Sequence, residues 1–75
     1  MDNISINVLK NNLRAYRIKN GYSQADVADQ IGVSVSAFKN WERKPNKITF
    51  EKMAKLAKLY NVSVKDFFLC YDILL

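Results

Sequence analysis

The most constraining feature of the sequence is a tight joint between two short helix-forming stretches, residues 24–30 and 35–43. Only four residues, Ile31-Gly32-Val33-Ser34, separate them, and so short a joint turning at a glycine sets two helices at a steep angle. Ala28 has to be small because the second helix crosses close over it, and Phe38 has to be apolar to fill the gap between the helices. The other apolar positions of this wedge are Val27, Ile31, Val33 and Trp41.

Capping and stop signals divide the rest of the chain into three more helices, expected over residues 8–19, 50–60 and 64–72. The expected N-caps are Ser23, Ser34, Thr49 and Ser63, and the expected stops are Gly21, Gly32 and Asn61. Residues 44–47 are the longest expected loop. No stretch shows the sustained period-two alternation of a strand. With 75 residues, two Gly and one Pro, the sequence predicts a single all-α domain of five helices over residues 1–75.

The residue inventory argues against several kinds of chemistry. The chain has no His and a single Cys, Cys70, so the usual zinc frameworks, an intramolecular disulfide and a histidine base are excluded. We therefore expect no enzyme, no metal and no cofactor. Because small secreted domains normally need disulfides, we expect the reducing cytoplasm. The apolar C-terminal stretch is too short to span a membrane, and no signal peptide is expected.

The charge balance indicates a polyanionic partner. Twelve Lys and Arg against seven Asp and Glu give a net charge of +5, which favours nucleic acid, an anionic membrane or an acidic protein. Solubility alone is the alternative explanation. The excess is concentrated, because residues 10–19 carry four basic residues and no acidic one, and residues 34–47 carry four basic residues and one acidic residue.

Residues 23–43 resemble the helix-turn-helix of the phage Cro and CI repressors and of the wider xenobiotic-response-element (XRE) family. The resemblance rests on the opening Ser23-Gln24-Ala25-Asp26, the Ala28–Gly32 spacing and the closing Trp41-Glu42-Arg43. It extends over about residues 9–68, through Leu13–Arg17 on one side and the Asn61-Val62-Ser63 exit on the other. It implies a compact five-helix, lambda-repressor-like DNA-binding domain whose helix-turn-helix spans about residues 24–43. Lys44 replaces a glycine frequent in the family, and Asn46 is a candidate for the left-handed residue there.

The resemblance also implies roles in binding double-stranded DNA, with the second helix of the motif in the major groove. The implied base contacts are Ser34, Val35, Ser36, Lys39 and Asn40. The implied phosphate contacts are Ser23, Gln24, Arg43, Lys44, Asn46 and Lys47. The alternatives are that the two serines only cap the helix, that Val35 is a half-buried filler, and that the cations and amides are a solvated face.

Other residues are expected to be structural. The resemblance implies that Arg17 pairs with Glu42, with a phosphate contact as the alternative for Arg17. Trp41 is expected to pack inward with Ala28, Gly32 and Phe38 of the helix-turn-helix, with stacking on DNA as the alternative. Tyr22 is expected to pack beneath the turn. Cys70 is expected to be an apolar filler, with a reactive thiol as the alternative.

Residues 62–75 form an apolar C-terminal segment. The core is expected to absorb Val62, Val64, Phe67 and Phe68. An isologous dimer would cover the expected interface residues Leu69, Tyr71, Ile73, Leu74 and Leu75; folding back over the chain's own core is the alternative. The expected function is that of a sequence-specific transcriptional regulator, a repressor on a two-fold symmetric operator. The competing interpretation is an antitoxin-like or adaptor subunit that acts through protein contacts of its C-terminus.

Overall fold

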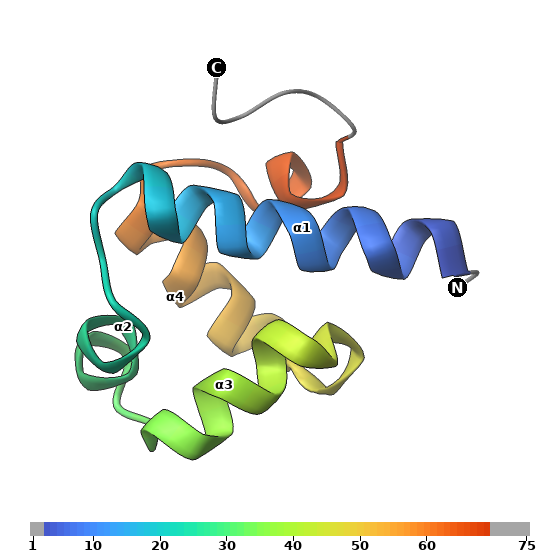
Figure 1. The fold of residues 1–75 in the computed structure, drawn as a ribbon. Coiled ribbons are helices and arrows are strands. Elements are labelled where there is room, and N and C mark those ends of the chain that lie inside the picture. The colour runs from blue at the N-terminus through green and yellow to red at the C-terminus, as the bar shows by residue number, and fades with distance from the viewer. Residues whose placement is uncertain (1–2, 70–75) are drawn as a thin grey trace.

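A computed structural model describes residues 3–69, which form four α-helices and two short 3-10 helices (Figure 1). The elements are α1 (Asn3–Lys19), α2 (Gln24–Ile31), α3 (Val35–Arg43), η1 (Pro45–Lys47), α4 (Phe50–Tyr60) and η2 (Val64–Phe68). The described residues contain no strand. The all-α prediction is therefore confirmed, with four α-helices in place of the five expected.

Side-chain caps fix most of the helix ends. The hydroxyls of Ser23, Ser34 and Thr49 accept backbone N–H bonds at the starts of α2, α3 and α4. Gly32 ends α2 and Asn61 ends α4, both in the left-handed conformation that exposes the last carbonyls to the following N–H groups. These three helices agree with the predicted bounds to within one residue.

The predictions for α1 and η2 were wrong in extent. Helix α1 begins at Asn3 rather than near residue 8, because neither Gly nor Pro interrupts residues 3–8. The fifth expected helix is a 3-10 helix that ends at Phe68, and Leu69 is already extended. The buried Asn12 amide of α1 donates to the carbonyls of Asp66 (3.4 Å), Phe67 (2.9 Å) and Leu69 (2.7 Å), so these acceptors are held by a side chain instead of by further helical turns. Residues 70–72 of that expected helix lie outside the described residues.

The loop expected over residues 44–47 is a turn of 3-10 helix. Pro45 at its start is buried against the core, which anchors the turn. Asn46 is not left-handed, since Asn61 is the single described non-glycine residue with a positive φ. The expectation for Asn46 was wrong, because the 3-10 turn makes the reversal without such a residue.

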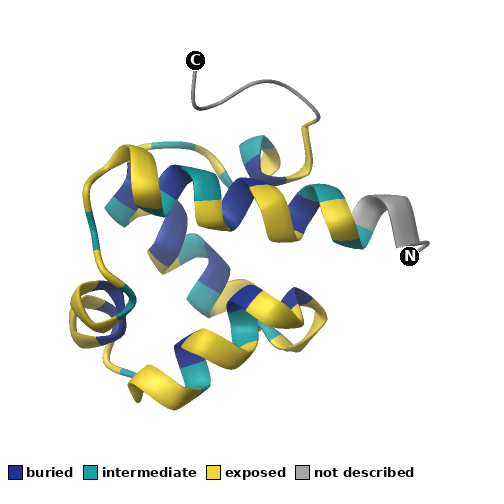
Figure 2. Ribbon diagram, in the orientation of Figure 1, coloured by how far each residue is buried: buried dark blue, intermediate teal, exposed yellow. Residues whose placement is uncertain are grey.

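The core lies where α1, α4 and the α2–α3 pair meet (Figure 2). Its buried apolar side chains are Leu9, Leu13, Tyr16, Val27, Ala28, Ile31, Phe38, Met53, Leu56, Ala57, Tyr60 and Phe67. Phe67 of η2 makes edge-on ring contacts with Tyr16 at 5.8 Å and with Tyr60 at 6.3 Å, which attaches η2 to α1 and α4. In Figure 1, η2 and the α2–α3 pair lie on opposite sides of α1. Figure 2 shows exposed positions along the outer side of α3.

Candidate nucleic-acid interface

The α2–α3 corner is built from local hydrogen bonds and a buried wedge. A capping box opens α2: Asp26 N–H donates to the Ser23 hydroxyl at 3.0 Å, and Ser23 N–H donates to the Asp26 carboxylate at 2.9 Å. These bonds from Ser23 lower the pKa of Asp26 below its usual value. At the turn, Gly32 has a φ of 75°, and Val33 N–H donates to the Ala28 carbonyl at 3.0 Å.

The wedge predicted for this corner lies in the interior. Val27, Ala28, Ile31 and Phe38 are buried, and Val33, Trp41 and Tyr22 are half-buried against the same core. Trp41 therefore lies on the inner side of α3 together with Phe38. This packing fixes which face of α3 turns outward, because residues three or four positions apart share a helix face.

A buried ion pair joins α1 to α3. The Arg17 guanidinium donates to both Glu42 carboxylate oxygens, at 2.7 and 3.1 Å, with side-chain exposures of 13% and 8%. Arg17 also donates to the Tyr22 carbonyl at 3.0 Å, and the Gln24 amide donates to Glu42 at 2.8 Å. We call these four residues the brace. It fixes the start of α2 and the end of α3 relative to α1.

The place of Gln24 in the brace was not foreseen. Its amide nitrogen is bonded to Glu42, whereas the sequence interpretation gave Gln24 a phosphate contact only. The contact joins residues 18 positions apart, and no local spacing signals it. The bond from Arg17 to the Tyr22 carbonyl was missed for a different reason: the residues are five positions apart, but a backbone acceptor is present at every residue and gives no sequence signal.

The predicted base-contacting residues share one exposed surface of α3. We call Ser34, Val35, Ser36, Lys39 and Asn40 the reading face; all five are exposed. Val35 is exposed to 38%. Ser34 does cap α3, accepting from Ala37 N–H at 3.0 Å, and Asn40 accepts a bond of 3.2 Å from the exposed Arg43.

A hollow of about 560 Å³ lies over part of the reading face. Its lining residues are Gln24, Ser36, Lys39, Asn40 and Arg43. They come from the first turn of α2 and from the length of α3, so the structure brings predicted base and phosphate contacts together at one concave, polar surface.

The predicted phosphate contacts flank this hollow at two ends. Ser23 is exposed and Gln24 half-buried at the start of α2, while Arg43, Lys44, Asn46 and Lys47 are exposed at the end of α3 and on η1. Glu42 is the single carboxylate between residues 34 and 47, and it is buried against Arg17. The exposed charges of α3 and η1 are therefore all positive.

The C-terminal predictions are met in part within the described residues. Phe67 is buried and Val62 and Val64 are half-buried, but Phe68 is 43% exposed, so the expectation that the core absorbs it was wrong. The 3-10 turn of η2 commits Phe67 to the core and turns its neighbour outward. Leu69 is 46% exposed. Cys70, Tyr71, Ile73, Leu74 and Leu75 lie outside the described residues.

Within residues 3–69 no group of His, Cys, Asp or Glu could hold a metal ion. No helix in that part of the chain combines the length and the apolar character needed to cross a bilayer. The hollow over the reading face is lined by cations, amides and a hydroxyl, so it supplies hydrogen-bond donors and positive charge to a polyanion.

Comparison with known proteins agrees with this geometry. Residues 13–67 match the model of a protein family described as "Helix-turn-helix", a family of DNA-binding rather than enzymatic domains. Comparisons with curated proteins and with solved structures gave no significant match. Since the family match covers more than half of the chain, the protein belongs to the XRE-type helix-turn-helix family of DNA-binding transcriptional regulators.

Proposed function

We propose that the protein represses transcription by binding, as a homodimer, a two-fold symmetric operator in double-stranded DNA. The observation that carries this proposal is the outer surface of α3, where every exposed charge is positive because Glu42 is buried by Arg17. A cationic helix of nine residues whose outer face is open to solvent fits the major groove.

The reading face supplies a distinct chemistry at each position. Asn40 can bond bidentately to adenine, after releasing its exposed bond from Arg43. Lys39 can donate to guanine or to a phosphate, and Val35 can pack on a thymine methyl group. The hydroxyl of Ser36 can donate or accept, and Ser34 retains its O–H as a donor while its oxygen caps α3.

The phosphate contacts would hold α3 in register with the base pairs. Arg43, Lys44, Asn46 and Lys47 would reach one strand from the end of α3 and from η1. Ser23 and Gln24, with the free N–H groups at the start of α2, would reach the other side of the groove. The brace supports this role, because it couples the two ends through Gln24 and Glu42.

The dimer would use the exposed side chains of Phe68 and Leu69 together with the apolar segment that follows them. Two-fold pairing sets two reading helices about 34 Å apart, one turn of B-form DNA. Occupation of an operator that overlaps a promoter would block transcription. We place this action in the cytoplasm and assign it no cofactor.

Selection of bound sequences from a random duplex pool tests the proposal. We expect a palindromic consensus with half-sites one helical turn apart, and an affinity that falls by orders of magnitude between 50 and 200 mM salt. The variant Asn40→Ala should relax the preference at one base pair per half-site, whereas Lys47→Ala should weaken all sequences alike. Lys65→Ala, on η2, is the control and should change neither the base-pair preference nor the overall DNA affinity. Absence of any enriched sequence would refute operator recognition.

The second candidate is an antitoxin-like or adaptor subunit, favoured by the adjacent exposed Phe68 and Leu69. In that case the main ligand is another protein, held by apolar contacts. Its binding would depend weakly on salt, in contrast to DNA binding.

A further inference from the structure

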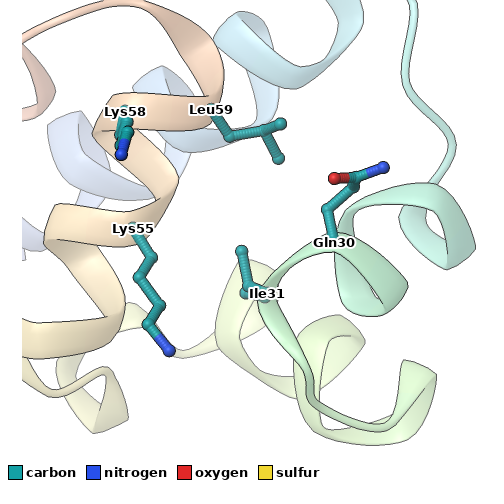
Figure 3. Close-up of a pocket in the computed structure, with 5 residues that line it drawn as sticks. All are labelled: Gln30, Ile31, Lys55, Lys58 and Leu59. Carbon is teal, nitrogen blue, oxygen red and sulfur yellow. The ribbon is translucent and has the colours of Figure 1, made fainter.

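A second hollow lies between α2 and α4, away from the reading face (Figure 3). It is a shallow depression, widely open to solvent, with a volume of about 460 Å³. Its lining residues are Gln30, Ile31, Lys55, Lys58 and Leu59. In Figure 3, Ile31 and Leu59 extend into the space between the two helices, with Gln30 at the edge of α2 and both lysines along α4.

This hollow is independent of the proposed DNA contacts. It shares no lining residue with the hollow over the reading face. Helix α2 contributes its first residue, Gln24, to that hollow and its last two residues, Gln30 and Ile31, to this one. A ligand could therefore occupy the α2–α4 hollow while α3 lies on DNA.

The lining combines an apolar floor with a positive rim. Ile31 belongs to the buried core at the bottom of the hollow, and Leu59, half-buried against that core, adds exposed aliphatic surface. Lys55 and Lys58 bring two ammonium groups, Gln30 brings an amide, and no carboxylate lines the hollow.

Neither the Lys55 nor the Lys58 ammonium group makes a close ion pair among the described residues. Lys55 approaches Glu51 at 3.9 Å, an exposed pair one helical turn apart that adds little stability. Lys58 forms no ion pair within residues 3–69. Both cations are thus available to an anionic ligand.

We infer that the α2–α4 hollow binds an acidic segment of a partner protein, with one large apolar side chain of that segment inserted between Ile31 and Leu59. The aliphatic floor favours this occupant over a nucleic acid, whose bases bind proteins by stacking on aromatic or guanidinium planes. The concave shape favours an inserted side chain over a flat lipid surface. Carboxylates flanking the inserted side chain would lie against Lys55 and Lys58.

The test uses fluorescence anisotropy with a labelled ten-residue peptide of Asp and Glu that carries a central Leu-Phe pair. The full chain should bind it. Lys58→Glu should weaken binding at least tenfold, whereas Lys65→Glu, which makes the same change of charge on η2, should weaken it less than twofold. Replacing the Leu-Phe pair of the peptide by Ser-Ser should also weaken its binding at least tenfold. Circular dichroism should show both variants folded.

A saturating DNA duplex distinguishes this site from the reading face. The peptide should stay bound when the duplex is added, because the two hollows share no residue. Displacement by DNA would assign the peptide to the reading face and overturn the inference. Equal effects of the two charge reversals, no effect of the Ser-Ser replacement, or no binding at millimolar peptide would overturn it as well.

Discussion

At the scale of single residues, Tyr60 has a buried hydroxyl group that adds no hydrogen bond to the described part of the fold. Its hydroxyl has no hydrogen-bond partner among the described residues, while its ring packs against Tyr22 and Phe67. Burial, and to a lesser degree the nearby Glu42 carboxylate, raise the pKa of this phenol well above its usual range. The side chain therefore stays neutral and acts as a large apolar ring.

We predict that Tyr60→Phe leaves the protein as stable as the parent or up to about 1 kcal/mol more stable, because it removes an unsatisfied buried donor and keeps the ring contacts. Urea unfolding followed by circular dichroism measures the difference. DNA affinity should be unchanged. A loss of stability would mean that the hydroxyl has a partner in solution.

The brace allows a sharper comparison at the same scale. Glu42→Leu alone should destabilise the protein by about 3–5 kcal/mol, because it leaves the Arg17 guanidinium, which is only 13% exposed, without its counter-charge. The double variant Arg17→Met, Glu42→Leu should lose much less stability, since it removes the Arg17 charge together with the Glu42 carboxylate. Unfolding free energies of both single variants and the double variant complete the thermodynamic cycle. Additive losses would show that the pair is not coupled.

At the scale of the elements, the sequence predicts well what is decided locally. The bounds of α2 and α4 and the start of α3 follow from local signals, namely the caps Ser23, Ser34 and Thr49 and the left-handed turns at Gly32 and Asn61. The outward face of α3 follows from the spacing of Phe38 and Trp41. The start of α1 carries no comparable cap signal, so its length was underestimated.

Long-range contacts account for the rest. The end of η2 depends on Asn12, more than 50 positions away, and the orientation of Gln24 depends on Glu42 in the next helix. Such contacts leave no periodic trace in a single sequence. The resemblance predicted the Arg17–Glu42 pair, and the cap signal predicted the Ser23 bond, but the bonds of Gln24 to Glu42 and of Arg17 to the Tyr22 carbonyl could not be predicted from the sequence. The DNA contacts assigned to the exposed residues stay predictions.

The turn between α2 and α3 provides a prediction for these elements. An added Cβ at Gly32 would meet no atom within 4 Å, so the cost of a substitution comes from its φ of 75° alone. We expect Gly32→Ala to lower the free energy of unfolding by about 1–2 kcal/mol. Gly32→Asn should lose less, because asparagine tolerates this conformation, as Asn61 does at a φ of 59°. Thermal unfolding of the two variants checks the order, and an equal loss for both would point to a hidden steric contact.

At the scale of the whole molecule, the opposite sides of α1 carry surfaces of different character. The α2–α3 pair and η2 lie on the two sides (Figure 1). Helix α3 carries the exposed reading face, whereas Phe68 at the end of η2 and the adjacent Leu69 form an exposed apolar pair. A dimer formed through the η2 side would leave both reading faces open to DNA. The separation of the two surfaces is what makes the proposed dimer compatible with operator binding.

Sedimentation equilibrium at micromolar concentration tests that arrangement. We expect the parent chain to be a dimer and Leu69→Asp to be a monomer, because a charge at the centre of an apolar interface has to be desolvated on association. Phe50→Asp is the matched control: Phe50 is 74% exposed, more than Leu69, but it lies at the start of α4 beside η1. Phe50→Asp should therefore remain dimeric. On a duplex with two half-sites, Leu69→Asp should lose affinity by at least tenfold, whereas on a single half-site it should bind like the parent. A monomeric parent chain, or dissociation caused equally by both variants, would show that Leu69 does not define the interface.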